Sequence, residues 1–129
     1  MTSTNEMSKK ILVTNALPYA NNSIHIGHLV GYIQADIWVR YQKMKERDCL
    51  YLCASDSHGT PIMLSAEAIG LEPEALAEQY TKEHSKDFQD FLIEFDNYHS
   101  THTTENETLV GEIFNQLNKS GHIEKKIIE

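Results

Sequence analysis

Two histidines, His25 and His28, flank Gly27 in the stretch LPYANNSIHIGH. Imidazole N–H groups at this spacing can donate to phosphate oxygens and stabilise charge that grows in a transition state. Glycine has no β-carbon, so a ligand can approach the backbone closely there. The alternative is that one histidine bonds a backbone carbonyl while the other is merely exposed. Two histidines around a glycine at a strand-to-helix turn favour phosphate binding.

The flanking pattern predicts the elements that position these residues. Ile11–Thr14 is a β-branched run that predicts a buried strand, and the stretch CLYLCA predicts a second one. Between them, apolar residues recur every three or four positions, which predicts a helix of about 20 residues from Gly27. The expected buried stripe of this helix is Leu29, Ile33, Ile37, Tyr41 and Met44. Strand, helix and strand form a βαβ unit, which indicates an α/β fold with a parallel sheet.

Three further helices are expected along the chain. One begins at Thr60-Pro61, with the threonine as cap, and stops at Gly70. Another begins near Pro73, and a capping box at Thr104 predicts the last, which runs to about Lys119. The expected stripe of the middle helix is Leu76, Tyr80, His84, Phe88, Phe91 and Phe95. The stretch DNYHSTHT fits an edge strand or a loop, and HIEKKIIE suggests the start of a strand.

Composition limits the class of protein. The 129 residues suit one modest domain, and a net charge of -8 disfavours DNA and anionic membranes as partners. No apolar run approaches the roughly 20 residues of a membrane span, and the polar first ten residues lack a signal core, so we expect a cytoplasmic protein. Cys49 and Cys53 lie roughly 13 Å apart along the predicted strand, which favours buried free thiols.

Three separated segments carry a family resemblance. ALPYANNSIHIGH resembles the first signature of the class I aminoacyl-tRNA synthetases, and its lead-in resembles the methionyl-tRNA synthetases in particular. QADIWVRYQKMKERD and ASDSHGTPI are similar to the same family. The resemblance implies a doubly wound, Rossmann-like nucleotide-binding domain. Residues 9–129 would be its amino-terminal half, truncated before the zinc knuckle and the second half, with residues 1–8 as a flexible terminus.

The resemblance also implies a reaction and a set of site residues. Methionine would attack ATP, which is used with Mg²⁺, to form methionyl adenylate, and the methionyl group would pass to the methionine tRNA. His25 and His28 would hold the ATP phosphates and Gly27 would make room for adenine. Leu17 and Tyr19 would line the methionine pocket. Asp56 would receive the ammonium group of methionine. Asn22 departs from the family, which usually has glycine there.

Two signatures of the family are missing from the sequence. The Lys-Met-Ser-Lys-Ser motif is absent; the nearest string, Lys43-Met44-Lys45, is interpreted as a solvated helix face. The zinc ligands expected in the parent protein are also absent. We therefore expect the isolated chain to be inactive. Two alternatives remain: a short non-catalytic protein that binds a nucleotide or a synthetase, and a related nucleotidyltransferase that acts on small substrates.

Overall fold

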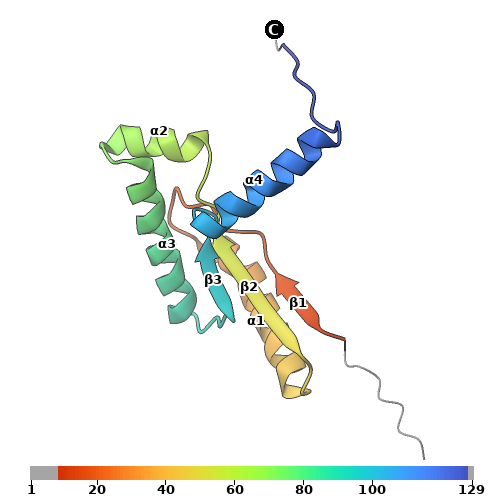
Figure 1. Ribbon diagram of the computed structural model, residues 1–129. Helices are drawn as coiled ribbons and strands as arrows, with labels where there is room; N and C mark the ends of the chain where they lie inside the picture. The colour runs from red at the N-terminus through yellow and green to blue at the C-terminus, as the bar shows by residue number, and fades with distance from the viewer. Residues whose placement is uncertain (1–8, 128–129) are drawn as a thin grey trace, which may run out of the picture.

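Within residues 9–127, three parallel strands form one sheet in the order β1-β2-β3 (Figure 1). The computed structural model describes residues 9–127, so the expected flexible segment 1–8 lies outside the described residues. The strands are β1 (Ile11–Thr14), β2 (Cys49–Ser55) and β3 (Asn97–Ser100). The predicted βαβ unit and its parallel sheet are confirmed, and β3 decides the open question in favour of an edge strand.

In the described part of the chain, four helices connect and flank the strands. They are α1 (Ile26–Met44), α2 (Thr60–Ile69), α3 (Pro73–Asp90) and α4 (Thr104–Lys119). Both predicted threonine caps are wrong by one residue. Gly59 caps α2 without a side-chain bond, and the Thr103 hydroxyl caps α4 by accepting from the Asn106 N–H. Gly70 ends α2 in the left-handed conformation, as predicted.

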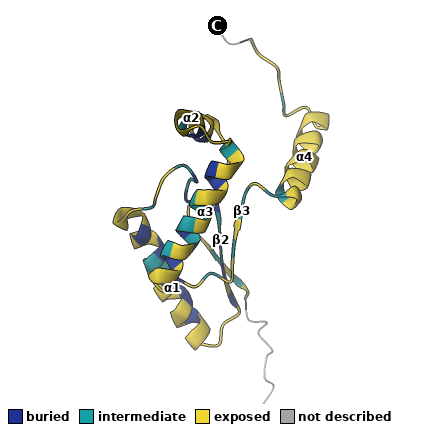
Figure 2. Cartoon of the chain, turned by 90° about the vertical axis from the view of Figure 1, so that its left-hand side faces the viewer, coloured by how far each residue is buried: buried dark blue, intermediate teal, exposed yellow. Residues whose placement is uncertain are grey.

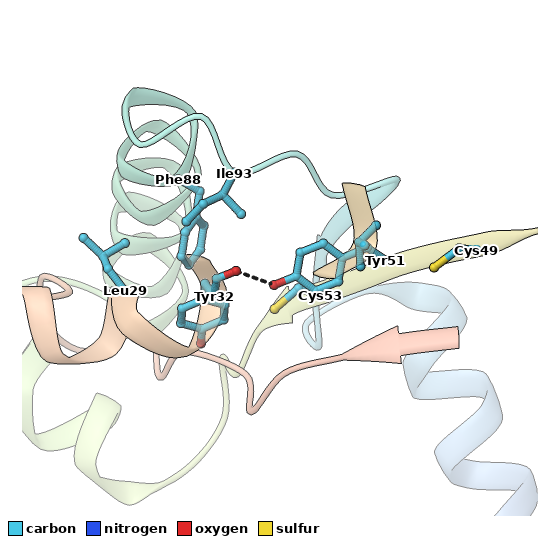
Figure 3. Close-up of a cluster of buried hydrophobic side chains, with 8 residues drawn as sticks. Leu29, Tyr32, Cys49, Tyr51, Cys53, Phe88 and Ile93 are labelled. Atoms are coloured by element: carbon cyan, nitrogen blue, oxygen red, sulfur yellow. Dashed lines mark hydrogen bonds between the residues drawn. The ribbon is translucent and has the colours of Figure 1, made fainter. Parts of the chain in front are cut away.

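The main core lies between one face of the sheet and the helices α1 and α3 (Figure 3). Tyr51 from β2 is fully buried, and Phe88 from α3 is nearly so. Cys49 and Cys53 point to this same face as buried free thiols, as predicted. Burial raises the pKa of the Cys53 thiol to about 11, which keeps the sulfur protonated and unreactive.

The predicted buried stripe of α1 is wrong over most of its length. Ile37 is 62% exposed and Met44 is 82% exposed. Leu29 is buried as predicted and Ile33 packs partly against the core, but the buried face continues through Tyr32, Asp36, Val39 and Gln42. The physical reason is that Asp36, a polar residue on this face, has a tertiary partner in Glu94, which apolar periodicity does not reveal.

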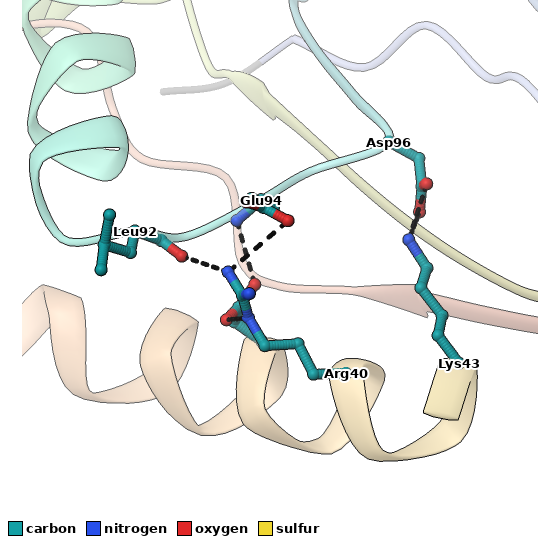
Figure 4. A network of polar contacts seen from close by, with 6 residues as sticks. Arg40, Lys43, Leu92, Glu94 and Asp96 are labelled. Carbon is teal, nitrogen blue, oxygen red and sulfur yellow. Dashed lines mark hydrogen bonds and ion pairs between the residues drawn. The ribbon is translucent and has the colours of Figure 1, made fainter. Parts of the chain in front are cut away.

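Asp36 and Arg40 together bind the turn that follows α3, and Figure 4 shows the contacts of Arg40 with Leu92 and Glu94. The Asp36 carboxylate accepts from Arg40 Nε at 2.6 Å and from the Glu94 backbone N–H at 2.9 Å. Arg40 also donates to the Leu92 carbonyl at 2.5 Å. These bonds hold the turn after α3 against α1. That turn also ends α3 at Asp90, so Phe91 and Phe95 lie beyond the helix that was expected to carry them.

Two apolar surfaces remain uncovered. On the other face of the sheet, Leu12 is 63% and Leu50 is 48% exposed. No residue of α4 is buried, and Figure 2 shows the helix exposed along its length and apart from α1 and α3. Residues 122–127 form no strand, so the expected terminal strand is wrong there, and residues 128–129 lie outside the described part. Within residues 9–127, the helices fall short of the length and hydropathy that a membrane span requires.

Candidate active site

The loop that joins β1 to α1 continues the parallel pairing beyond the ends of the strands. The Asp56 N–H donates to the Pro18 carbonyl at 2.9 Å, and the Ala20 N–H donates to the Asp56 carbonyl at 2.9 Å. Tyr19 and Asp56 therefore form a parallel bridge, with Asp56 directly after β2 and Tyr19 five residues after the end of β1. Ligands of open α/β sheets bind at this carboxyl edge. Two of the residues expected to bind methionine are thus backbone neighbours there.

Gly59 leaves space for the Tyr19 side chain, a role that the sequence did not predict. Its φ is +122°, a conformation that L-amino acids with a side chain rarely adopt. A β-carbon at Gly59 would lie 2.8 Å from the Tyr19 hydroxyl oxygen. The glycine thus permits both the sharp entry into α2 and the position of the phenol. The available signal was its place directly before Thr60-Pro61, where a helix was expected to begin.

His25 and His28 cap α1 reciprocally. His25 Nδ1 accepts from the Gly27 N–H at 3.1 Å, and His28 Nδ1 accepts from the His25 N–H at 3.2 Å. The two rings stack with centroids 3.7 Å apart and planes inclined by 20°. Because each Nδ1 accepts, each ring carries its proton on Nε2, as assigned from this bonding pattern. Both exposed side chains thus offer an Nε2–H donor beside the positive end of the helix dipole.

Gly27 makes room for one of these rings. A β-carbon at Gly27 would lie 3.0 Å from His25 Cε1 and 3.1 Å from His25 Nδ1. The missing side chain therefore lets the His25 ring fold back over the helix terminus. This is a structural reason for glycine between the histidines. The expected space for adenine at Gly27 stays a prediction.

A pocket of about 430 Å³ opens beside the capped helix terminus. Its lining includes Tyr19, Asn22, His25 and His28. Leu17 and Asp56 do not line this pocket. Leu17 lies two residues before Tyr19 in the sequence, and Asp56 pairs with Tyr19 in the bridge. The described lining residues contain no lysine or arginine, so its hydrogen-bond donors are imidazoles, amides and hydroxyls.

A larger pocket of about 700 Å³ lies away from these residues. It is formed where α4 leaves the sheet, and His58, His102 and Phe114 contribute to its wall. None of the residues expected to bind ATP or methionine lines it. The rings of His58 and His102 lie 5.3 Å apart, and His102 Nε2 is 3.7 Å from a Glu74 oxygen. Among residues 9–127, no group of three or more His, Cys, Asp or Glu side chains is arranged to hold a metal ion.

Lys43 and Lys45 lie at the opposite end of α1 from the histidines. Fifteen residues separate His28 from Lys43, which is roughly 22 Å along a helix axis. Lys43 Nζ donates to Asp96 at 2.7 Å, and Lys45 Nζ lies 5.8 Å from the centre of the Tyr41 ring. These lysines do not line the pocket, and both have contacts at the far end of the helix. Lys43, Met44 and Lys45 are exposed, as predicted for a solvated helix face, and Lys43 is in addition paired with Asp96.

Comparison with known proteins identifies consistent relatives. The family model described as tRNA synthetases class I (M) matches residues 11–129. The methionine–tRNA ligase of Francisella tularensis subsp. holarctica is 56% identical over 120 residues, which cover 93% of this chain and 18% of that protein. The chain thus spans about a fifth of the length of the curated relatives it matches.

Solved structures give the same fold. The methionyl-tRNA synthetase of Mycobacterium tuberculosis, bound by methionyl-adenylate, matches with a TM-score of 0.84 and 26% identity, over 88% of this chain and 22% of that one. A LeuRS from Agrobacterium radiobacter, in a ternary complex with tRNA and LeuAMS, matches with a TM-score of 0.83 over 91% of this chain and 15% of that one. At 22% identity, the second match shows the fold alone.

Proposed function

Since the chain belongs to the class I tRNA synthetases of the methionine type, we propose that residues 9–129 are the amino-terminal half of the catalytic domain of a methionine–tRNA ligase. The enzyme would couple ATP to the joining of methionine and its tRNA. One observation carries the proposal: the two free Nε2–H donors of His25 and His28 lie at the same sheet edge as the Tyr19–Asp56 bridge.

The first step would be activation of methionine. A carboxylate oxygen of methionine attacks the α-phosphorus of ATP, the bond to the bridging oxygen breaks, and pyrophosphate leaves with that electron pair. We assign His25 and His28 to the ATP phosphates, where both Nε2–H groups can follow the charge that develops in the transition state. No covalent intermediate on the protein is needed. Positioning and charge stabilisation would supply the acceleration.

Methionine, the other substrate of that step, would lie beside ATP. We assign the methionine ammonium group to the Asp56 carboxylate, because a single opposite charge suits an α-amine. Leu17 and Tyr19 would contact the methionine side chain, since an apolar wall and an aromatic ring suit a polarisable thioether. In the next step a ribose hydroxyl at the 3′ end of the tRNA would attack the activated carbonyl, and AMP would leave.

The uncovered apolar surfaces support assignment to half of a larger domain. Parallel sheets are normally covered on both faces, yet Leu12 and Leu50 are exposed on one face here. The apolar side of α4 is likewise bare, with Ile113 and Phe114 each more than half exposed. The order β1-β2-β3 leaves β1 at an edge, next to the candidate site. In a doubly wound sheet the second half begins at that edge.

The remaining assignments rest on the family alone. We propose Mg²⁺ as the partner of ATP and assign it no residue of this chain. Zinc would belong to the parent protein, and a cytoplasmic location would suit an enzyme that supplies translation. The isolated chain should not turn over, because it lacks the lysine-rich signature that would meet the leaving pyrophosphate.

Exchange of labelled pyrophosphate into ATP tests the proposal. The protein is a full-length ligase in which residues 1–129 have this sequence. We expect exchange that depends on methionine and that leucine and valine do not support. Exchange that another amino acid supports equally well would overturn the methionine assignment. Exchange without any amino acid would instead favour a nucleotidyltransferase with a different small substrate.

A further inference from the structure

His84 is the one buried histidine among the seven, all of which lie within residues 9–127. It comes from the middle of α3 and has no exposed surface. Phe88, one turn further on, belongs to the main core, whereas Tyr80, one turn before, packs against a second cluster around Ala20 and Ile62. The apolar spacing of α3 predicts His84 as a core residue, which explains its burial but not its chemistry.

The ring of His84 makes one hydrogen bond, to the loop that carries the candidate site. Its Nε2 lies 2.7 Å from the backbone carbonyl oxygen of Asn22, 62 residues away in sequence. A carbonyl only accepts, so Nε2 must carry the proton. Nδ1 is then a buried acceptor, and among residues 9–127 it has no partner. A buried polar atom without a partner destabilises the folded state, a cost that an apolar residue at this position would avoid.

This hydrogen bond holds a stretch of loop whose backbone makes no other hydrogen bond within the described part of the chain. Before Asn22, the loop is tied to β2 through Ala20 and Asp56, and after it the helix cap begins at His25. Among the hydrogen bonds of the described residues, His84 makes the one that reaches residues 22–24. The loop also lines the pocket beside the two capping histidines. His84 therefore helps to fix the distance between the Tyr19–Asp56 bridge and the capping residues His25 and His28.

We propose that His84 is a positioning residue for the reaction, acting through the Asn22 carbonyl. This inference rests on the proposed function and deepens it. By fixing the middle of the loop to α3, His84 sets where the Nε2 atoms of His25 and His28 meet ATP relative to methionine at Asp56. An error of about 1 Å in such an arrangement can cost on the order of a hundredfold in rate.

Three variants of the full-length ligase test this role. His84→Leu fills the space without a donor, and His84→Met replaces it if the leucine variant does not fold. His84→Gln restores an N–H near the position of Nε2. Phe88→Leu is the matched control, because it perturbs a side chain that is equally buried on the same helix but makes no bond to the loop. For each variant, kcat and KM of pyrophosphate exchange, the methionine Kd without ATP, and Tm are measured.

We expect His84→Leu to lower kcat about tenfold or more while the methionine Kd stays within about threefold, because Tyr19 and Asp56 hold each other independently. His84→Gln should recover kcat to within about threefold of wild type. An unchanged kcat in His84→Leu would overturn the proposal. So would an equal loss of kcat in Phe88→Leu at the same Tm, because the effect would then be one of stability.

Amide hydrogen exchange of residues 20–28 gives a readout that does not need activity. We expect faster exchange in His84→Leu and wild-type rates in His84→Gln. Equal rates in all variants would refute the positioning role. If the wild-type enzyme shows no methionine-dependent pyrophosphate exchange, the proposed function fails, and the loop measurement still decides whether His84 orders the site.

Discussion

His25 and His28 cap the same helix with their Nδ1 atoms and stack ring on ring at 3.7 Å. One nitrogen of each ring is therefore structural, and the other is free to donate. The two roles lie on different atoms of one side chain, so they can be separated by substitution. Asparagine places an acceptor near the position of Nδ1 but has nothing at Nε2.

Replacing His25 with asparagine should therefore separate folding from chemistry. Asparagine is among the best residues at an N-cap, so we expect His25→Asn to change the free energy of unfolding by no more than about 0.5 kcal/mol. Pyrophosphate exchange should fall about 100-fold, in the range seen when one donor to a transition state is removed. Urea unfolding and steady-state exchange on the full-length enzyme measure both. Retained exchange in His25→Asn would show that Nε2 does not contact ATP.

The matched comparison is His25→Ala. Alanine removes both the cap and the donor, so this variant should lose about 1 kcal/mol of stability in addition to the activity. The same pair of substitutions at His28 should follow the same pattern, because its Nδ1 accepts from the His25 N–H. Methionine binding should change little in all four variants. A large loss of methionine affinity would place the histidines in the amino-acid pocket instead.

Asp56→Asn tests the ammonium assignment without changing the size of the side chain. Loss of the carboxylate charge should weaken methionine binding by about 10- to 100-fold, the worth of a hydrogen bond to a charged group. Equilibrium dialysis of labelled methionine in the absence of ATP measures the effect. Asp48→Asn is the control, since Asp48 lies just before β2 begins, at the end remote from the site. Equal affinities for the two variants would reject Asp56 as the ammonium partner.

Gly59→Ala should disturb the position of Tyr19. The positive φ of Gly59 strains any L side chain, and the added β-carbon would lie 2.8 Å from the phenol oxygen. We expect a loss of about 1–3 kcal/mol in stability and a weaker methionine Kd. Gly111→Ala is the control, because a β-carbon there meets nothing within 4 Å on helix α4. That variant should gain up to about 1 kcal/mol. If Gly59→Ala binds methionine normally, Tyr19 does not need this support.

Local patterns predicted the strands around the motif better than they predicted the packing. The strand ahead of the motif and the parallel βαβ unit follow from short-range signals that the structure bears out, whereas the bridge between Tyr19 and Asp56 was found only in the structure. The buried face of α1 did not follow, because α1 carries apolar residues on more than one side. The choice of face depends on Asp36, whose partner Glu94 is 58 residues away. Hydrophobic periodicity contains no information on such a bond.

The same limit applies to His84. Its apolar spacing on α3 correctly predicted burial, but the bond to Asn22 joins residues 62 positions apart. Asn22 departs from the family pattern, but this departure does not predict the bond, because the atom that accepts it is a backbone carbonyl oxygen that any residue would supply. Only the folded arrangement of α3 against the loop reveals it. Every residue has a backbone carbonyl, so the residue type at position 22 does not predict such a long-range contact.

The contacts of Asp96 determine the sign with which protein stability depends on pH. Burial opposes the ionisation of Asp96, but hydrogen bonds from Lys43 Nζ and the Tyr51 N–H outweigh it, so its pKa lies below the ordinary value. A carboxylate with a lowered pKa in the folded state stabilises the protein above its unfolded-state pKa of about 3.9. That contribution is lost as the pH falls through the folded-state value.

We therefore expect Asp96→Asn to be less stable than wild type at pH 7 by about 1 kcal/mol, a value reduced for solvent screening. The difference should be constant down to about pH 5 and should narrow below about pH 4, because the wild-type carboxylate then protonates as well. Urea unfolding of the full-length enzyme between pH 3 and pH 7, the range that spans carboxylate titration, measures this difference in stability. Glu94→Gln serves as the control, since Glu94 lies in the same connection with its side chain 78% exposed and should change stability by under about 0.5 kcal/mol throughout. A difference for Asp96→Asn that persists unchanged at pH 3 would mean that the loss comes from packing rather than from the ionised carboxylate.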